Sequence, residues 1–429
     1  MRRFTQLALA VISITSFSYR SQADETLYRV SGAAIQDGAG GQIAKFQRAA
    51  VEALKKCGNN LTQLSADGKF GPGTRRAVQS LSRCPEIAGR LEDRGSVQSG
   101  AITRELWGIL LPGEPLPTVD ERTVGLLLAF EATDFNHAEW NFCQNKPLYN
   151  PAAGQSRCVS NDARSFLTWG PNGATAGHGR EILAIVSQVD QNRPDLIDAA
   201  FAEEAPSLRK AIALENRADN SDLEIHLCKV WLDRDRRQAW KDGFAEFGIQ
   251  PQVQKTYRDL YKSANFDGGK IERFYRLWNQ AGLRPTEIDY AFFVDRAAHS
   301  TPNDARISAA LANAPRNANG MITSAAARRA VSLGNRAGNV SQVKDRLGRD
   351  VTFYADAFEP ELSREERLAW NDRGRRKASD VGLSDQRPAP SFRAEAAIAW
   401  QTATPVSLSS TEREGCPPAV LNPEKPIRN

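Results

Sequence analysis

The sequence VGLLLAFEATDFNHAEWNF at residues 124–142, followed by SFLTWGPNGATAGHGRE at residues 165–181, decides how the chain folds. The first stretch is an apolar run that ends abruptly on a carboxylate, Glu131. The second stretch surrounds Thr175 with Gly and Pro residues, which break any helix and require turns or a tight hairpin. The pattern therefore predicts a buried helix that ends in an acid and is followed by a glycine-rich hairpin.

A helix ending in Glu131, followed by the hairpin Gly173-Ala174-Thr175-Ala176-Gly177-His178-Gly179, resembles the lysozyme-like superfamily of glycosidases. The hairpin is similar to those of phage-type lysozymes and bacterial chitosanases. The resemblance implies an α+β catalytic domain with a small β-hairpin and a helical second lobe. It also implies that Glu131 is the general acid and that Thr175 positions a water or a sugar hydroxyl.

Glycosidic bond cleavage needs a proton for the leaving oxygen and a second group on the other face of the sugar. The apolar neighbours of Glu131 disfavour its ionised form, so we expect a raised pKa suited to an acid. The alternative is a helix-end Glu that points at water.

The second catalytic group is harder to assign, because the related families carry an Asp shortly before the hairpin Thr. Those places are Trp169 and Gly170 here. The carboxylates that lie nearby in the sequence are Asp134, Glu139, Asp162 and Glu181. Asp134 shares a face with Glu131 if the helix continues, and Asp162 lies just before the hairpin. A one-acid route, as in lytic transglycosylases and goose-type lysozymes, stays open as well.

Several residues around the hairpin are candidates for substrate binding. Trp140 and Trp169 are amphipathic platforms suited to sugar rings, although Trp is as often part of a core. The remaining candidates are Gly173, Gly177 and His178, of which His178 is better explained as structural or as bonded to a hairpin carbonyl.

Residues 41–112 are predicted to form three short helices around a glycine-rich loop. Phe46-Gln47 in the first helix precedes Asp67-Gly68-x-Phe70-Gly71-Pro72-x-Thr74-x-x-Ala77-Val78, which resembles the peptidoglycan-binding domain of cell-wall hydrolases. This resemblance covers most of residues 40–112 and implies that peptidoglycan glycan strands are the partner. The alternative is a three-helix bundle that serves only as a spacer. Residues 113–118 are a short, semi-rigid proline linker.

Residues 1–23 have a basic start, an apolar centre and a small-residue cleavage site, which are typical of a secretory signal peptide. The 56 Lys and Arg residues, less the three Arg of this segment, leave 53 against 51 Asp and Glu. A near-neutral chain gives no case for nucleic-acid binding. No later stretch reaches the length of about 18 apolar residues that a membrane span needs. We expect a periplasmic or secreted protein.

The six cysteines of an exported chain are expected to pair. Position favours Cys57 with Cys84 and Cys143 with Cys158, which leaves Cys228 with Cys416, although sequence does not fix the pairing. The spacing of Cys and His fits no metal site, so we expect neither a metal nor a cofactor.

The remaining chain divides into residues 119–385, the lysozyme-like domain with a helical extension, and residues 386–429, an extended or disordered tail. Asp289, in a segment that loosely resembles the second lobe of chitosanases, is expected to be structural. The fold class is therefore mainly α. The favoured function is an exported glycosidase that cuts the β-1,4 backbone of peptidoglycan. The alternatives are a non-catalytic wall-binding or scaffold protein and a chitosanase-like glycosidase.

Overall fold

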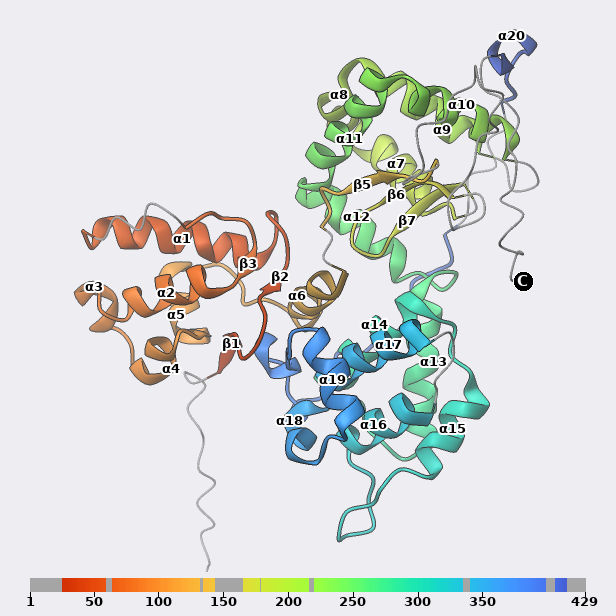
Figure 1. Ribbon diagram of the computed structural model, residues 1–429. Coiled ribbons are helices and arrows are strands. Elements are labelled where there is room, and N and C mark those ends of the chain that lie inside the picture. Colours follow the sequence, from red (N-terminus) through yellow and green to blue (C-terminus); the bar gives the residue numbers. More distant parts are fainter. Residues whose placement is uncertain are drawn as a thin grey trace, which may run out of the picture.

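The computed structural model describes residues 25–58, 64–131, 134–142, 165–177, 179–215, 220–334, 340–398 and 406–414. The described chain is mainly helical, as predicted, and forms three packed parts (Figure 1). We call them the module (residues 25–112), the sheet lobe (134–261) and the helical lobe (267–385). Helix α6 (Val119–Glu131) lies between the three parts. The predicted signal segment lies outside the described residues, as do Asp162, His178, Cys143, Cys158 and Cys416.

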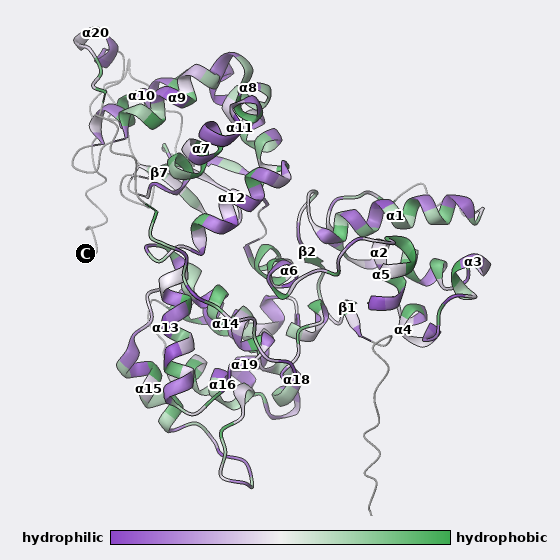
Figure 2. Cartoon of the chain, turned by 180° about the vertical axis from the view of Figure 1, so that it is seen from behind, coloured by the Kyte–Doolittle hydropathy of each residue, from purple (hydrophilic) through white to green (hydrophobic). Residues whose placement is uncertain are grey.

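The module contains the three helices predicted from the sequence, together with shorter elements. Its elements are β1 (Thr26–Tyr28), β2 (Ile35–Gln36), α1 (Gln42–Lys56), β3 (Lys69–Phe70), α2 (Pro72–Leu81), α3 (Pro85–Ala88), α4 (Arg94–Ser99), β4 (Ile102–Thr103) and α5 (Arg104–Leu110). Strand β1 pairs with β4 and β2 pairs with β3, so residues before the predicted start at 40 belong to the same unit. Along α1, hydrophilic and hydrophobic residues alternate in bands, as an amphipathic helix requires (Figure 2).

Gln47, in α1, links that helix to the glycine-rich motif by hydrogen bonds. Its Nε2 donates to the carbonyl oxygen of Lys69 at 3.0 Å and to Thr74 Oγ1 at 2.9 Å, while its Oε1 accepts from Gly68 N at 2.9 Å. Gly68 has φ +73°, a conformation that glycine adopts without strain. The motif is therefore one hydrogen-bonded unit that fixes the loop against α1.

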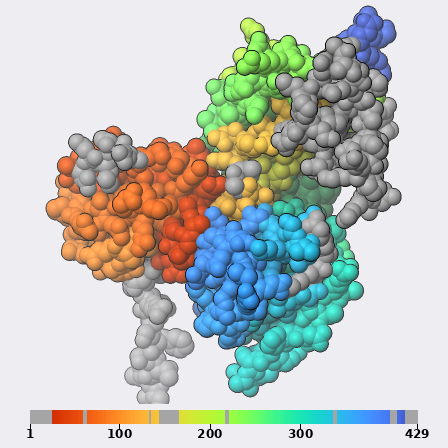
Figure 3. Space-filling model, viewed as in Figure 1, coloured from red at the N-terminus to blue at the C-terminus, as the bar shows by residue number. Residues whose placement is uncertain are grey.

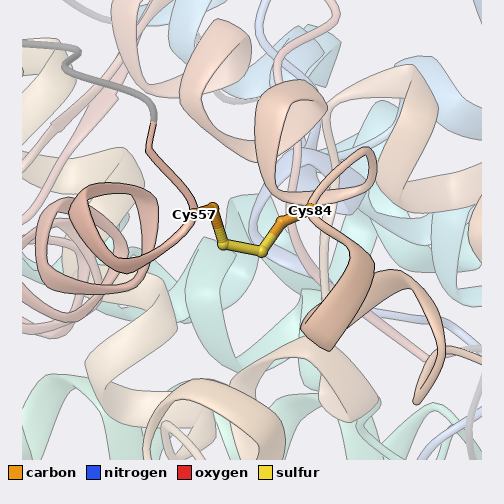
Figure 4. The surroundings of a disulfide bond; sticks show 2 residues. All are labelled: Cys57 and Cys84. Carbon is orange, nitrogen blue, oxygen red and sulfur yellow. A yellow bond between two sulfur atoms is a disulfide. The ribbon is translucent and has the colours of Figure 1, made fainter.

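A disulfide joins Cys57, at the end of α1, to Cys84, just before α3 (Figure 4). This confirms the predicted pair. Closing a loop of this length stabilises the module by roughly 3–4 kcal/mol in the chain-entropy view. Cys228 is also disulfide-bonded, whereas the Cys143–Cys158 pair and Cys416 fall outside the described residues.

The module is docked on the rest of the protein and does not depend on the linker alone for its position. Gln36 Nε2 donates to the carbonyl oxygen of Leu128 in α6 at 2.9 Å, and Gln42 Nε2 donates to Glu121 at 2.7 Å. Hydrophobic side chains of the module, α6 and the helical lobe form one continuous core. Figure 3 shows the start of the module pressed against the helical lobe. Removing the module would therefore expose part of a shared core.

The sheet lobe contains one antiparallel sheet with strand order β5-β6-β7 and a set of helices packed on it. Its elements are β5 (Ala138–Trp140), β6 (Ser165–Trp169), β7 (Ala174–Gly177), α7 (Glu181–Asn192), α8 (Pro194–Phe201), η3 (Ala202–Glu204), α9 (Ala205–Leu214), α10 (Ser221–Leu232), α11 (Arg234–Gly248) and α12 (Pro251–Tyr261). Glu139 in β5, Thr168 in β6 and Thr175 in β7 are the less buried residues of the strands, and the other strand residues are buried, many of them against the helices.

The helical lobe has α13 (Asp267–Gln280), α14 (Glu287–His299), α15 (Asp304–Ala312), α16 (Ser324–Gly334), α17 (Val340–Thr352), α18 (Ala355–Phe358), η4 (Glu359–Glu361), α19 (Arg364–Asp372) and η5 (Ala378–Val381). Asp289 is fully buried, takes part in the capping box of α14 and accepts from Arg328 Nη1 at 2.6 Å. Its surroundings are those of the structural residue that we expected.

The described part of the predicted tail, residues 386–398 and 406–414, is bonded to both lobes. Ala389 N donates to the carbonyl oxygen of Pro285 at 2.9 Å, and Glu395 N donates to that of Lys262 at 3.0 Å. Further on, Leu408 is buried beside the sheet lobe and α20 (Ser410–Arg413) follows. Across the described residues, every helix is too short or too polar to cross a bilayer.

A buried carboxyl where the module meets the sheet lobe generates a stability prediction. Asp37 Oδ2 accepts from Ile43 N at 2.8 Å, while Oδ1 is buried without a hydrogen-bond partner among the described residues. Burial raises the pKa of Asp37 to about 8, and the nearby Asp134 adds to this. The folded protein therefore holds this proton more tightly than the unfolded chain does, so stability falls as pH rises from about 4 to about 8.

Asp37→Asn keeps the oxygen that caps α1 and removes the charge. We expect it to raise the stability at pH 8.5 by about 1 kcal/mol or more, which is roughly 1–2 °C in Tm for a chain of this length, with little change at pH 4. Calorimetry at both pH values measures this. An equal effect at the two pH values would contradict a buried, titrating Asp37.

Candidate active site

Helix α6 brings Glu131 to the place where the module and both lobes meet. Phe130 and Leu126 enter the core shared with the helical lobe, which sets the rotation of the last turn. Arg373 Nη1 donates to the carbonyl oxygen of Phe130 at 3.0 Å, and the Arg349 guanidinium lies 5.5 Å from the centre of the Phe130 ring. Cations at a helix C-terminus are favourable because they face unpaired carbonyl groups.

The carboxylate of Glu131 is held by two residues of the helical lobe. Arg349 Nη1 lies 2.5 Å from Glu131 Oε1, and His299 Nε2 lies 3.0 Å from the same oxygen. Arg349 also approaches Asp295 at 3.4 Å and Asp345 at 3.4 Å. Within the described residues, the hydrogen bonds and ion pairs of the Glu131 carboxylate are all to Oε1, and its side chain is 27 % exposed.

These contacts correct the expectation that Glu131 has a raised pKa. Burial does raise it, but the hydrogen bonds from His299 and Arg349 and the positive charges of both outweigh burial. The pKa of Glu131 is lowered to about 2. The apolar neighbours in the sequence predicted a pKa shift in the wrong direction, because His299 and Arg349, which lower the pKa, come from helices far away in the sequence. In this geometry Glu131 is an ionised carboxylate at neutral pH.

His299 faces two incompatible demands at the same nitrogen. Its Nε2 is 3.0 Å from Glu131 Oε1, where it must donate, and 2.8 Å from Arg349 Nη1, where it would accept. Arg349 already donates to Glu131, so the arrangement is best satisfied when His299 Nε2 carries a proton that it shares with Glu131. In this arrangement the Nε2 atom of His299 holds a proton directly beside the Glu131 carboxylate.

The glycine-rich hairpin forms as predicted. Strands β6 and β7 pair in antiparallel register with Thr168 opposite Thr175, and the turn has φ +77° at Gly170 and φ +65° at Gly173. A Cβ at Gly170 would lie 2.7 Å from the Tyr257 ring, so a larger residue does not fit there. Gly177, with φ +125°, ends β7.

One face of the sheet is polar and carries Thr175. Glu139, Thr168 and Thr175 lie opposite one another across the three strands, so their side chains share a face. Asn141 Nδ2 donates to Thr168 Oγ1 at 2.7 Å. The other face is buried against the helices of the sheet lobe. The polar face is thus the less buried face of the sheet.

Thr175 is bonded to the first residue of α7. Both its backbone N, at 3.1 Å, and its Oγ1, at 3.0 Å, donate to Glu181 Oε2. Gly179 passes so close to this pair that a Cβ there would lie 1.9 Å from Thr175 Oγ1 and 2.3 Å from Glu181 Oε2. Only glycine at position 179 allows the contact.

Electrostatic effects connect the Thr175 side of the site to the Glu131 side. Burial raises the pKa of Asp267, at the start of α13; the charges of Lys270 and His299 lower it, and that of Glu181 raises it. Asp267 is therefore close enough to sense both Glu181, which holds Thr175, and His299, which contacts Glu131. Lys270 Nζ, which binds Asp267 at 2.9 Å, also donates to the carbonyl oxygen of Ala297 at 2.8 Å, two residues before His299.

The structure corrects the interpretation of both tryptophans as sugar platforms. Trp169 is fully buried, donates to the carbonyl oxygen of Phe135 at 2.6 Å and packs on aromatic residues of α11 and α12. Trp140 is 3 % exposed and packs against Trp240. Both indoles lie on the core face of the sheet, so neither offers a ring face to a substrate.

The other predicted residues are placed as follows. Helix α6 ends at Glu131, so Asp134 does not share its face, and its carboxylate lies against Gly38 of the module. Glu139 is half exposed and lies 3.0 Å from His137. Asp162 and His178 are outside the described residues. Sequence analysis missed Arg349, His299 and Asp267, because nothing in their local sequence connects them to Glu131.

Comparison with protein families, with curated proteins and with solved structures finds no match for this chain. Among the described residues, no group of His, Cys, Asp and Glu is arranged to hold a metal ion. The function proposed for the chain therefore rests on its own residues and their geometry.

The Glu131 contacts predict an acid-dependent loss of stability. The folded pKa of about 2 lies below the ordinary value of 4.5, so the stabilisation is complete above pH 4.5 and is lost as pH falls toward 2. The difference corresponds to at most roughly 3 kcal/mol, and solvent screening at a partly exposed group reduces it.

Glu131→Gln should therefore be less stable than wild type at pH 7 and similar to it at pH 2.5. Chemical denaturation at several pH values measures the difference. Glu246→Gln, at an exposed position of α11, serves as the control. A Glu131→Gln deficit that does not shrink in acid would show that the ion pair contributes nothing to stability.

Proposed function

We propose that this protein is a lysozyme-like cell-wall glycosidase that cuts the β-1,4 glycan backbone of peptidoglycan. The observation that carries the proposal is the position of Glu131. It ends a buried helix between two lobes, and the next elements form a small antiparallel sheet whose polar face bears Thr175. This order of elements is the one expected from the sequence resemblance to lysozyme-like enzymes. The resemblance of the module to peptidoglycan-binding domains is a separate argument for peptidoglycan as the substrate.

The low pKa of Glu131 constrains how it could act as the acid. A carboxylate with a pKa of about 2 carries almost no proton of its own at neutral pH. The proton for the leaving oxygen can reach Glu131 from His299, whose Nε2 is 3.0 Å from Oε1. As the glycosidic bond lengthens, His299 gives its Nε2 proton to Glu131 and Glu131 gives a proton to the leaving oxygen; His299 then takes up a proton from solvent. Arg349 keeps the carboxylate in place.

The Glu131–Arg349 ion pair also favours a second candidate function. A carboxylate bound by a buried arginine is a common structural element, and both predicted tryptophan platforms are in the core. In this alternative the protein binds peptidoglycan without cutting it, and Glu131 only fastens α6 to the helical lobe. The two candidates make different predictions for the release of fragments.

The first test is digestion of purified sacculi with mature protein, followed by mass spectrometry of the released fragments. Wild type should release fragments, and Glu131→Gln should lower the rate by on the order of 10² to 10⁴ because the proton path is lost. Circular dichroism at pH 7 checks that the variant is folded. Glu246→Gln should behave as wild type.

Sedimentation with sacculi separates the two candidates. Binding without fragment release by folded wild-type protein would support the non-catalytic alternative. Fragment release that is unchanged in folded Glu131→Gln would exclude Glu131 as the acid.

The proton path predicts a further effect at His299. His299→Gln keeps a hydrogen-bond donor near Glu131 but carries no proton to transfer. We expect kcat to fall at least tenfold with KM nearly unchanged, because the substrate contacts are preserved. A rise in KM alone would instead indicate that His299 contacts the glycan.

A further inference from the structure

We infer that Glu181 is the second carboxylate of the proposed glycan-cleaving site and that it acts from the sheet lobe, opposite Glu131. This inference rests on the proposed function. Trp169 and Gly170 stand where related enzymes carry an acid before the hairpin Thr. Here the acid comes from the other side of that Thr, at the first residue of α7.

The side chain of Glu181 is held with one oxygen bound and one available. Its Oε2 accepts both hydrogen bonds from Thr175, at 3.1 Å and 3.0 Å. Within the described residues, no hydrogen bond to Oε1 and no ion pair to Glu181 is formed. The two donors fix the orientation of the carboxylate, and Oε1 can accept a proton from a bound water. A rigid hold on one oxygen is what a general base requires.

Gly179 shows that the chain is built around this contact. Position 179 requires glycine because of the space available and not because of its backbone conformation. Any Cβ there would overlap Thr175 Oγ1 and Glu181 Oε2. The tight turn after β7 therefore brings Glu181 back over the hairpin. The glycine-rich sequence that suggested a hairpin also serves to admit this carboxylate.

Other carboxylates near the junction fit the role less well. Asp267 is 7 % exposed and its Oδ1 is bound by Lys270 Nζ at 2.9 Å, so it cannot meet a sugar. Glu139 lies two strands away from Thr175 and pairs with His137. Glu181, in contrast, influences Asp267, which also senses the His299 that contacts Glu131. Lys270, which binds Asp267, also donates to the carbonyl oxygen of Ala297 at 2.8 Å, so the start of α13 lies against the end of α14, two residues before the His299 that contacts Glu131.

With two carboxylates the reaction is hydrolysis. Glu181 takes a proton from a water molecule while the water oxygen forms a bond to the anomeric carbon. The bond from that carbon to the glycosidic oxygen breaks, its electron pair stays on the oxygen, and the oxygen takes the proton that His299 supplies through Glu131. His299 regains a proton from solvent. One water is consumed, each glycan fragment ends in an ordinary reducing sugar, and Glu181 returns its proton to solvent.

The test compares Glu181→Gln with Glu181→Ala in the full-length protein, using sacculi as substrate. Glu181→Gln can still accept from Thr175, so its fold and its sedimentation with sacculi should be unchanged while turnover falls on the order of 10² to 10⁴. Glu181→Ala should regain turnover when sodium azide is added, because azide attacks the anomeric carbon without needing a base. The released fragments should then carry azide. A purely structural role would not be rescued in this way.

Two substitutions at Thr175 test whether its hydroxyl positions Glu181. Thr175→Ser keeps the hydroxyl and should retain turnover, whereas Thr175→Val should lower kcat with little effect on KM. Glu246→Gln is again the control.

The outcomes separate this inference from the proposed function. If Glu131→Gln is inactive while Glu181→Gln turns over like wild type, the proposed function stands and Glu181 is not its base. Strong loss in Glu139→Gln but not in Glu181→Gln, or release of anhydro-sugars by wild type, also overturns the inference. If wild type releases no fragments, the proposed function and the inference both fail.

Discussion

Arg349 is the residue at which the parts of this protein are joined. Its side chain is 5 % exposed, contacts the carboxylates of Glu131, Asp295 and Asp345, and covers the ring of Phe130. These groups come from α6, α14 and α17. Removing one partner of a buried ion pair leaves an uncompensated charge and typically costs about 3–5 kcal/mol. The end of α6 therefore has a fixed position relative to the helical lobe. The elements that pack on α6, such as β2 of the module, are positioned relative to the helical lobe through it.

The same contact determines which chemistry is open to Glu131. An apolar helix end suggests a protonated carboxyl group, but two cationic partners reverse the balance and hold the group ionised. A proposed acid with this pKa has to work with a proton donor beside it, which is the place His299 occupies. The pKa of a site residue is set by what surrounds it in space, so a sequence window around Glu131 could not yield its sign.

The features of the fold that depend on residues close together in the sequence were predicted. The turn glycines of the β6–β7 hairpin act within one element of their position, so the residue pattern predicted the hairpin. The helices of the module were predicted from their periodicity in the same way, whereas the Gln47 contacts that fix the glycine-rich loop span 21 to 27 residues and were not predicted. The Cys57–Cys84 pair was predicted from position in the same way. The burial of Trp140 and Trp169 also had a signal, which the platform interpretation overlooked. Strand alternation places Trp169 on the face opposite Thr168, and pairing across the sheet adds Trp140 to that face. By contrast, Arg349 is 218 residues from Glu131, and no periodicity relates them.

The docked module adds a geometric constraint to the proposed function. Strand β2 packs on α6, and the bond from Gln36 reaches Leu128, less than one helical turn before Glu131. Because α6 is itself fixed by Arg349, the module and the junction of the two lobes form one rigid frame. A glycan strand bound to such a module would meet Glu131 at a set distance and angle, whereas a flexible linker would only raise its local concentration. The shared core is the physical reason that binding and cleavage, if both occur, cannot be assigned to separable pieces of this chain.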